Sequence, residues 1–391
     1  MYTVEQIKRF ANEQYDWAVE TRRQLHRIPE PGFQETKTKA LIKQKLEEIG
    51  LVYDAPAGGW ITALVDGGKP GKVTAFRADF DALPLEEPEG LPFRSEHPGY
   101  MHACGHDMHT AMLLSTGRLL KNLPDGFNGK CLLMFEPAEE TEGGAKPMAE
   151  SGMLEKYAVD RVYGLHVMPR LPVGQVESRY GTLNASTDGI ELIVKGTGSH
   201  GAYPENGNDA IVCAAQLISA LQSIVSRNVS PLESAVLTLG TIRGGSASNI
   251  ICDEVRMTGT LRCADKQLRQ KIVKRIEDMC SGIGTALGCE VQAKITEGYC
   301  ALVNTDEHVT RILNAARALY GDDNALIKDA PSMGAEDFSY FIDRTPGAFF
   351  HIGCSTDADH IGAPLHSRDF MPDERCMEIG IAMEAALTIN D

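Results

Sequence analysis

Residues 102–110 bring one thiol, three imidazoles and a carboxylate within about two helical turns of chain. The same chemistry recurs downstream in the acidic pair Glu139–Glu140, in His166 and in His366. Thiolate, imidazole and carboxylate are the groups that divalent transition metals select. Because these residues occupy four separate segments and the chain has no Cys-x-x-Cys pair, we expect a metal site assembled by the fold rather than a local zinc finger.

Each of these residues also has an ordinary structural explanation. A lone cysteine is usually a small buried hydrophobic residue, a lone histidine is usually structural, and adjacent carboxylates are usually solvated. Three polar groups, however, follow apolar runs that read as buried strands: Asp79 after 73–78, Glu139–Glu140 after 131–135, and His166 after 162–165. Open α/β sheets bind ligands outside the carboxyl ends of their strands, so this repeated placement favours a metal site.

Length and composition restrict the possible partners and location. A chain of 391 residues suggests two domains, and a net charge of −16 argues against nucleic acid or an anionic membrane as the main partner. No apolar run approaches the ~20 residues of a membrane span, and the N-terminus lacks the apolar centre of a signal peptide. Ten cysteines without a disulfide-like pattern fit a reducing, cytoplasmic location.

The order of elements predicts an α/β domain interrupted by a smaller one. Residues 4–50 read as helical with a break at 26–32, and residues 60–182 alternate short apolar strands with helices, the clearest being 107–123. This alternation predicts a sheet with helices on both faces, and it resumes after about residue 298. We therefore expect one α/β domain built from residues 1–183 and 298–391, completed by both ends of the chain.

The intervening residues 184–297 follow a different pattern. They read as a strand (189–196), a helix (208–227), two strands (235–243 and 254–262), a long helix (265–287) and a last strand (290–295). The order β-α-β-β-α-β is the ferredoxin-like arrangement, so we expect a small inserted domain.

Several motifs together resemble the M20 metallopeptidase family, in its aminoacylase-like amidohydrolase branch. In order along the chain they are residues 77–84 (RADFDALP), 101–107 (MHACGHD), 136–140 (EPAEE), 198–204 (GSHGAYP), 248–251 (SNII), 334–338 (GAEDF) and 364–366 (PLH). The resemblance spans nearly the whole chain. It implies a catalytic domain holding two divalent metal ions, a lid domain that also mediates dimerisation, and hydrolysis of an amide between an acyl group and an amino acid.

The resemblance also implies residue roles that spacing alone leaves open. It makes Glu139 the general base, His200 in the lid an oxyanion donor, and it assigns as metal ligands Cys104, His106, Glu140, His166 and His366. Most of the wider family has His-x-Asp at the first motif, whereas here Arg77 stands in the histidine position. Asp79 is then expected to orient a ligand rather than to bind metal. Weaker candidates to support a ligand or hold substrate are Asp107, Asn249 and Arg262.

Three functions remain open on the sequence. The first is an amidohydrolase that releases a free amino acid from an N-acyl-L-amino acid such as an N-acetyl or N-benzoyl derivative. The second is a dipeptidase or carboxypeptidase using the same chemistry, and the third is a non-catalytic ligand-binding protein on the same scaffold, which the presence of Glu139 beside all five ligand candidates disfavours. The glycine-rich residues 196–201 lack the Gly-Lys-Ser/Thr ending of a phosphate loop. Zinc, manganese, cobalt or nickel could fill the sites, and a thiolate ligand favours zinc or cobalt over magnesium.

Overall fold

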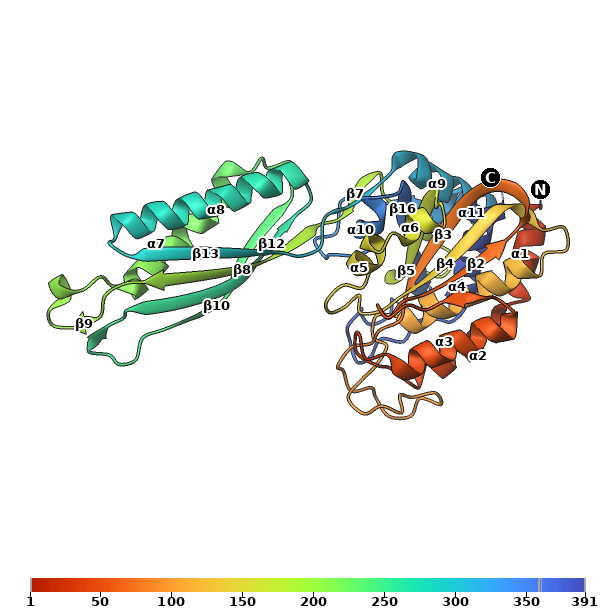
Figure 1. Ribbon diagram of the computed structural model, residues 1–391, viewed down its shortest axis with the longest axis horizontal. Coiled ribbons are helices and arrows are strands. Elements are labelled where there is room, and N and C mark those ends of the chain that lie inside the picture. The colour runs from red at the N-terminus through yellow and green to blue at the C-terminus, as the bar shows by residue number, and fades with distance from the viewer. Residues whose placement is uncertain (1, 358, 360, 390–391) are drawn as a thin grey trace. The chain divides into compact units, whose positions relative to one another are not determined.

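The computed structural model describes residues 2–357, 359 and 361–389, and the chain folds as two compact units. The first unit takes the chain up to Leu183, Val303–Ala330 and the chain from Asp337 onward, and the second takes Asn184–Leu302 and Pro331–Glu336. Figure 1 shows most of the second unit, coloured green to cyan, built from the middle of the chain, while the first unit holds both the red and the blue ends.

A mixed eight-stranded sheet forms the centre of the first unit. Its order is β1-β2-β4-β3-β5-β16-β6-β15, and the central strands β4, β3, β5 and β16 run parallel. The strands are β1 (Tyr53–Asp54), β2 (Ile61–Asp66), β3 (Gly68–Asp79), β4 (Phe127–Glu136), β5 (Arg161–Pro172), β6 (Val176–Ser178), β15 (Ala325–Ile327) and β16 (Gly347–Ser355). Buried on both faces, the central strands are almost continuously apolar, as parallel strands usually are.

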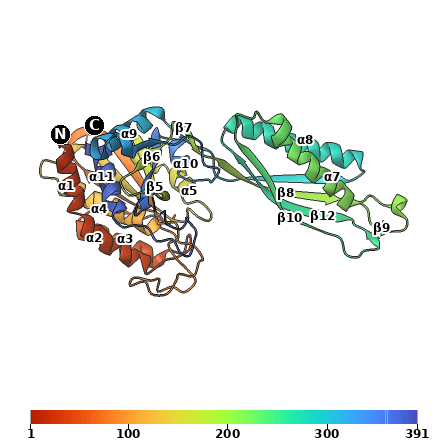
Figure 2. The same ribbon diagram turned by 180° about the vertical axis from the view of Figure 1, so that it is seen from behind.

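Helices cover both faces of this sheet, which confirms the predicted α/β class (Figures 1 and 2). On one face, α4 and α11 lie against the strands, with α1, α2 and α3 packed around them. On the other face lie α5, α6 and α10. The helices are α1 (Val4–Asn12), α2 (Tyr15–His26), α3 (Thr36–Ile49), α4 (His106–Lys121), α5 (Ala145–Glu150), α6 (Met153–Lys156), α9 (Asp306–Tyr320), α10 (Ser339–Ile342) and α11 (Cys376–Ile389).

The N-terminal helices begin and end where the local chemistry dictates. Thr3 and Gln6 form a capping box at the start of α1, and Gly50 ends α3 with a φ of 78°. The break expected at residues 26–32 is present, since α2 ends at His26 and α3 begins only at Thr36. The loop between these helices contacts the segment that follows β3, where the Ala82 amide donates to the Glu30 carbonyl at 2.9 Å.

The second unit has the element order expected for residues 184–297. Strands β8 (Ser186–Lys195), β10 (Ala235–Gly244), β12 (Glu254–Cys263) and β13 (Glu290–Glu297) form an antiparallel sheet of order β10-β12-β8-β13, alternating with helices α7 (Ala210–Ser223) and α8 (Lys266–Ala286) as β-α-β-β-α-β. Ile190, Leu192 and Val194 alternate along β8 into its core. Two short strand pairs complete the chain: β9 (Ser199–His200) with β11 (Ile250–Ile251), and β7 (Gly181–Asn184) with β14 (Leu302–Asn304).

One helical stretch of the described chain, Ala210–Asn228, is long and apolar enough to cross a membrane by length and composition alone. The sequence analysis expected no such run. The core helix of a globular domain passes the same test, and here α7 places Cys213, Ala214, Leu217 and Leu221 in the core of the second unit. The stretch is therefore weak support for a membrane span.

Candidate metal centre

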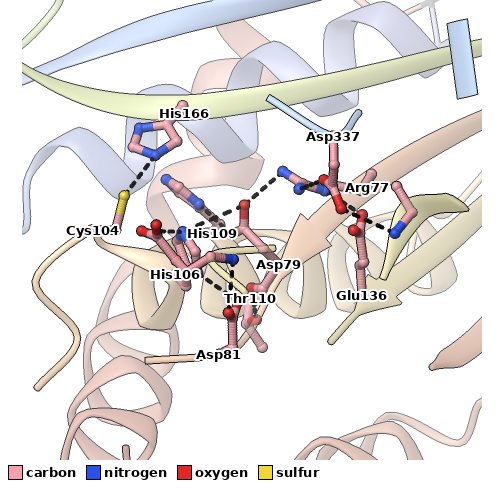
Figure 3. A network of polar contacts seen from close by, with 12 residues as sticks. Arg77, Asp79, Asp81, Cys104, His106, His109, Thr110, Glu136, His166 and Asp337 are labelled. Carbon is pink, nitrogen blue, oxygen red and sulfur yellow. Dashed lines mark hydrogen bonds and ion pairs between the residues drawn. The ribbon is translucent and has the colours of Figure 1, made fainter. Parts of the chain in front are cut away.

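The five ligand candidates meet in the first unit as two groups that share one thiol. The ligating atoms of Cys104, His106 and His166 lie within 4.8 Å of one another, and so do those of Cys104, Glu140 and His366. Figure 3 shows the first group between α4 and the strand that carries His166. Because both groups contain Cys104, they form two adjacent candidate sites with three donors each.

The turn before α4 brings Cys104 and His106 to the same place. Gly105 between them has a φ of 89°, and a Cβ on this residue would lie 2.5 Å from Cγ2 of Val167. Only glycine combines that backbone conformation with so close an approach. The Cys104 Sγ lies 3.2 Å from Nε2 of His166, which lies in the middle of β5 and not after the end of a strand, as the sequence had led us to expect.

Both imidazoles of the first group use Nδ1 elsewhere, so their Nε2 atoms are left for the centre. His106 donates from Nδ1 to Oδ1 of Asp81 at 3.1 Å, and His166 donates from Nδ1 to the carbonyl oxygen of Val167 at 2.6 Å. A partner on the far nitrogen fixes the ring orientation and tautomer of a metal-binding histidine. Nε2 of His106 lies 4.0 Å from Oε1 of Glu140 and so faces the second group.

His109, a further imidazole near the centre, has hydrogen-bond partners on both ring nitrogens. Its Nδ1 donates to Oδ1 of Asp79 at 2.6 Å, and its Nε2 accepts from the backbone amide of Val167 at 3.0 Å. Asp79 and His109 thus hold the β5 segment next to His166 (Figure 3). Asp79 lies where we expected it, at a strand end beside the ligands.

The acidic pair lies on a tight turn after β4. Ala138 has a φ of 60° and is fully buried, while Glu139 is 9% exposed. The Glu140 amide donates to Oδ2 of Asp81 at 3.0 Å, and Oε1 of Glu140 lies 2.9 Å from Nε2 of His366. His366 itself has a φ of 61° and donates its amide to the carbonyl of Ala103 at 2.9 Å, so the C-terminal segment is tied directly to the Cys104 turn.

The electrostatics of the centre suit cations. Burial, together with the Glu140 carboxylate, raises the pKa of the Cys104 thiol well above its usual value, and burial lowers the pKa of His166 well below its own. Burial opposes ionisation of Glu140, but His366 and His106 outweigh it and lower the pKa of this carboxyl. A thiol, three imidazoles and a carboxylate converge here, and a bound divalent ion would stabilise both the thiolate and the neutral imidazoles. The residues present therefore fit a pair of such ions.

Arg77 is buried and forms three ion pairs. It stands in the position where the wider family has histidine. Its guanidinium reaches Asp79 at 2.6 Å, Glu136 at 2.6 Å and Asp337 at 2.8 Å, and its side chain has no exposed surface (Figure 3). Burial opposes ionisation of Asp79, but the charges of Arg77, His106 and His109 keep the pKa of that carboxyl well below its usual range. Arg77 thus compensates the acidic charge beneath the centre.

Asp107 belongs to a second buried network, on the α2 side of α4. Its Oδ2 lies 2.7 Å from Nε of Arg22 and 2.7 Å from Nδ1 of His26, whose Nε2 lies 2.7 Å from Oε1 of Glu87. Asp107 is 1% exposed, so its surroundings are those of a support for α4 rather than of a substrate contact. His102, from the same run as the ligands, has its ring 6.1 Å from that of His26.

The three remaining candidates lie in the second unit. His200 and Asn249 are both exposed and are neighbours there, because β9 pairs with β11 and the Gly201 amide donates to the Asn249 carbonyl at 2.8 Å. Arg262 lies on β12, in register with Val236 and Thr187. His200 and Asn249 thus share one tip of the second unit, whereas the ligand candidates all lie in the first.

Sequence reasoning gave no role to Asp81, to Glu35 or to two partners of Arg77, Glu136 and Asp337. Asp81, Glu136 and Asp337 each lie in one of the family motifs, and that placement was the only available signal. Glu35, whose Oε1 accepts from the Ala138 amide at 3.0 Å, gave none, because its role comes from a contact with a distant segment.

Taken together, the α/β sheet and the two three-donor groups at its polar edge define a metal-binding hydrolase. The chain belongs to the peptidase family M20/M25/M40, whose model matches residues 75–390, and this confirms the family resemblance.

Two relatives and one solved structure illustrate the relationship. The chain is 38% identical to the N-acetyldiaminopimelate deacetylase of Halalkalibacterium halodurans, over 93% of this chain and 96% of that one. It is 42% identical to the N-acetyl-L-cysteine deacetylase of Bacillus subtilis strain 168, over 87% of this chain and 80% of that one. The YXEP protein of Bacillus subtilis, a dinuclear metal-binding peptidase of the M20 family, superposes with a TM-score of 0.85 at 31% identity, covering 97% of this chain and 98% of that chain.

Proposed function

We propose that this protein hydrolyses the amide bond of N-acyl-L-amino acids, releasing a free amino acid and a carboxylic acid. The observation that carries the proposal is the pair of three-donor groups sharing Cys104, with Glu139 beside them on the turn that also supplies Glu140. An amide carbonyl is a poor electrophile and neutral water is a poor nucleophile, so the reaction needs both to be activated.

Each residue of the centre has a distinct role in this proposal. The ions would be held by Cys104, His106 and His166 on one side and by Cys104, Glu140 and His366 on the other. When bound, a pair of divalent ions lowers the pKa of a water and polarises a carbonyl. Glu139 takes the proton of the attacking water and passes it to the leaving nitrogen, work that typically contributes roughly 10²–10⁴-fold. His200 donates to the oxyanion that develops on the carbonyl.

The substrate class is supported by the relatives. Two of them remove an acetyl group from different amino acids, diaminopimelate and cysteine, so the shared chemistry lies in the N-acyl amide rather than in one amino acid. A dipeptidase or carboxypeptidase remains the second candidate, because a structural relative at 31% identity is described as a peptidase.

The metal, the assembly and the compartment extend the same proposal. The ions are zinc, cobalt, manganese or nickel, and the thiolate donor favours zinc or cobalt over magnesium. The inserted unit serves as the lid and as the surface of a homodimer. All ten cysteines are free thiols, which fits an enzyme of the reducing cytoplasm.

The test joins metal analysis with a substrate panel. Purified protein is loaded with zinc, cobalt, manganese or nickel, its metal content is measured, and amino-acid release is followed from N-acetyl, N-benzoyl and dipeptide substrates. We expect about two ions per chain and release from N-acyl amino acids. Release from dipeptides alone would establish the peptidase instead, and a fully loaded protein inactive on every substrate would support the ligand-binding alternative.

A further inference from the structure

We propose that Glu35 is a positioning residue that fixes the turn carrying the general base. The inference rests on the proposed function for the role of Glu139, but the contact on which it depends does not. Glu35 lies directly before α3, about a hundred residues from the acidic pair, and it touches neither of the two three-donor groups.

The turn needs external support because of its backbone. Ala138 adopts a φ of 60°, a left-handed conformation that is unfavourable for residues other than glycine, and it is fully buried. Its carbonyl accepts from the amides of Gly143 at 3.0 Å and Thr141 at 3.4 Å. Those bonds hold the far side of the turn and leave the Ala138 amide to be satisfied from elsewhere, since a buried amide without a partner is costly.

Glu35 supplies that partner. Its Oε1 accepts from the Ala138 amide at 3.0 Å, and the Glu35 residue is fully buried. The loop before it is packed equally closely, because a Cβ on Gly32 would lie 2.1 Å from Oγ1 of Thr141 and 2.8 Å from Cβ of Ala138. The segment between α2 and α3 therefore packs directly against the turn that carries Glu139 and Glu140.

A second buried carboxylate, that of Asp81, binds the backbone on the other side of Glu139. Oδ2 of Asp81 accepts from the Glu140 amide at 3.0 Å, while its Oδ1 accepts from His106. The residues immediately before and after Glu139 are thus each anchored through their amides by a carboxylate from another segment. A general base must lie within hydrogen-bond reach of the proton that it takes, so displacing the turn lowers turnover even when the base itself is intact.

The experiment compares three substitutions of Glu35 with a matched control. Glu35→Met removes the acceptor, Glu35→Asp shortens it by one methylene, and Glu35→Gln keeps a carbonyl oxygen that accepts the same bond. Burial raises the pKa of Glu35 to about 7, so the uncharged glutamine is a close substitute. The control is Glu30→Met: Glu30 accepts from the Lys37 and Thr38 amides at the start of α3 and makes no bond to the acidic turn.

We expect kcat to fall by about 10- to 100-fold in Glu35→Met and Glu35→Asp, with KM within about threefold and full metal content. Glu35→Gln should stay near wild type, and Glu30→Met should lower the melting temperature without this loss of kcat. Hydrogen exchange of the backbone segment 136–141, followed by mass spectrometry, should quicken in Glu35→Met and Glu35→Asp only. Glu35→Asp retains a carboxylate and serves if Glu35→Met does not fold.

Unchanged exchange and unchanged kcat in both Glu35→Met and Glu35→Asp would overturn the proposal. So would an equal loss of kcat in Glu30→Met, because the effect would then be general destabilisation. Hydrogen exchange needs no substrate. If the wild-type protein hydrolyses nothing on the panel, the proposed function fails, while faster exchange in the Glu35 variants would still establish the anchor.

Discussion

At the residue scale, the buried aspartate and glutamate side chains around the centre have different roles because their surroundings differ. Asp79 and Glu136 neutralise the buried Arg77, Asp81 holds one ligand ring and one backbone amide, and Glu140 faces His366. Glu139 lies close to Glu336 and Asp337, whereas its neighbour Glu140 lies close to Cys104 and His366. The turn thus gives the two adjacent carboxylates different surroundings.

The acidic pair provides the sharpest test at this scale. Glu139→Gln keeps size and polarity but cannot take a proton, so we expect kcat to fall by two or more decades, roughly the contribution of a general base. Metal content, measured by atomic emission, should remain near wild type. Glu140→Gln should instead lose metal, because it removes a ligand. If Glu139→Gln were the variant that lost metal, the assignment of the two residues would be reversed.

The residue types of the centre could be predicted from sequence, whereas the residues that hold them could not. Cysteine, histidine and glutamate at strand ends signal metal binding by their chemistry alone. Glu35 is an ordinary acidic residue until the fold brings it to Ala138. Nothing local marks such a residue, since its function is a contact with a distant segment.

At the scale of elements, α11 carries a buried carboxyl in an otherwise apolar helix. Glu384 is 1% exposed, and its Oε2 accepts from Oγ1 of Thr116 on α4 at 2.5 Å. Thr388, one turn further along, donates to the sulfur of Cys131 on β4 at 3.9 Å. Burial raises the pKa of Glu384 to about 8, so this carboxyl keeps its proton in the folded protein at neutral pH.

This raised pKa makes the stability of the first unit depend on pH. Below the ordinary pKa of 4.5, Glu384 is protonated in both the folded and the unfolded chain and costs nothing. As the pH rises toward 8, only the unfolded chain releases the proton, so stability is progressively lost, by up to a few kcal/mol. Glu384→Gln should therefore gain stability relative to wild type between pH 5 and pH 8.

Urea unfolding of metal-free protein at both pH values measures this difference. The control is Glu378→Gln, a partly exposed residue of the same helix that accepts from Asn12 at 3.3 Å. The effect of Glu384→Gln is compared with that of this control at each pH. A constant difference between Glu384→Gln and wild type at both pH values would mean that Glu384 is already ionised in the folded state.

Most elements could be predicted because their apolar patterns are regular. The stripes of α4 and α8 and the alternation of β8 leave little choice of secondary structure. The sequence predicted a helix over 208–227, but it gave no sign that Ile224–Asn228, which extend α7, are π-helical. Ala138 and His366, both in left-handed conformations, could not be foreseen either, because hydrogen bonds to distant segments stabilise them against local preference.

At the scale of the whole molecule, His200 belongs to the second unit and the five ligand candidates to the first. We propose that His200 acts at the centre either from the second unit of its own chain or from that of a partner subunit. An oxyanion donor works once charge has developed on the carbonyl. His200→Ala should therefore keep metal and fold, hold KM within a few-fold and lose about 10²–10³ in kcat.

Subunit mixing distinguishes the two routes. If His200 acts across a dimer, combining inactive Glu139→Gln and His200→Ala subunits should restore up to about a quarter of wild-type activity, since each mixed dimer regains one complete site. If it acts within its own chain, mixing should restore none. The control is Tyr203→Phe, which keeps the ring that lies 5.5 Å from the His200 ring. Near-normal turnover by His200→Ala alone would remove this residue from the mechanism.

The place of β16 in the sheet has a consequence for how the protein is made. This strand lies between β5 and β6, yet the ribosome produces it more than 160 residues after both, with the entire second unit in between. Until β16 emerges, β5 and β6 have no strand between them, and the apolar residues that pack against β16 remain uncovered. His366 and α11 are made later still, so the five ligand candidates can come together only after residue 366 has been made. Residues 184–302, which make up most of the second unit, are made before β16, and we expect them to fold first.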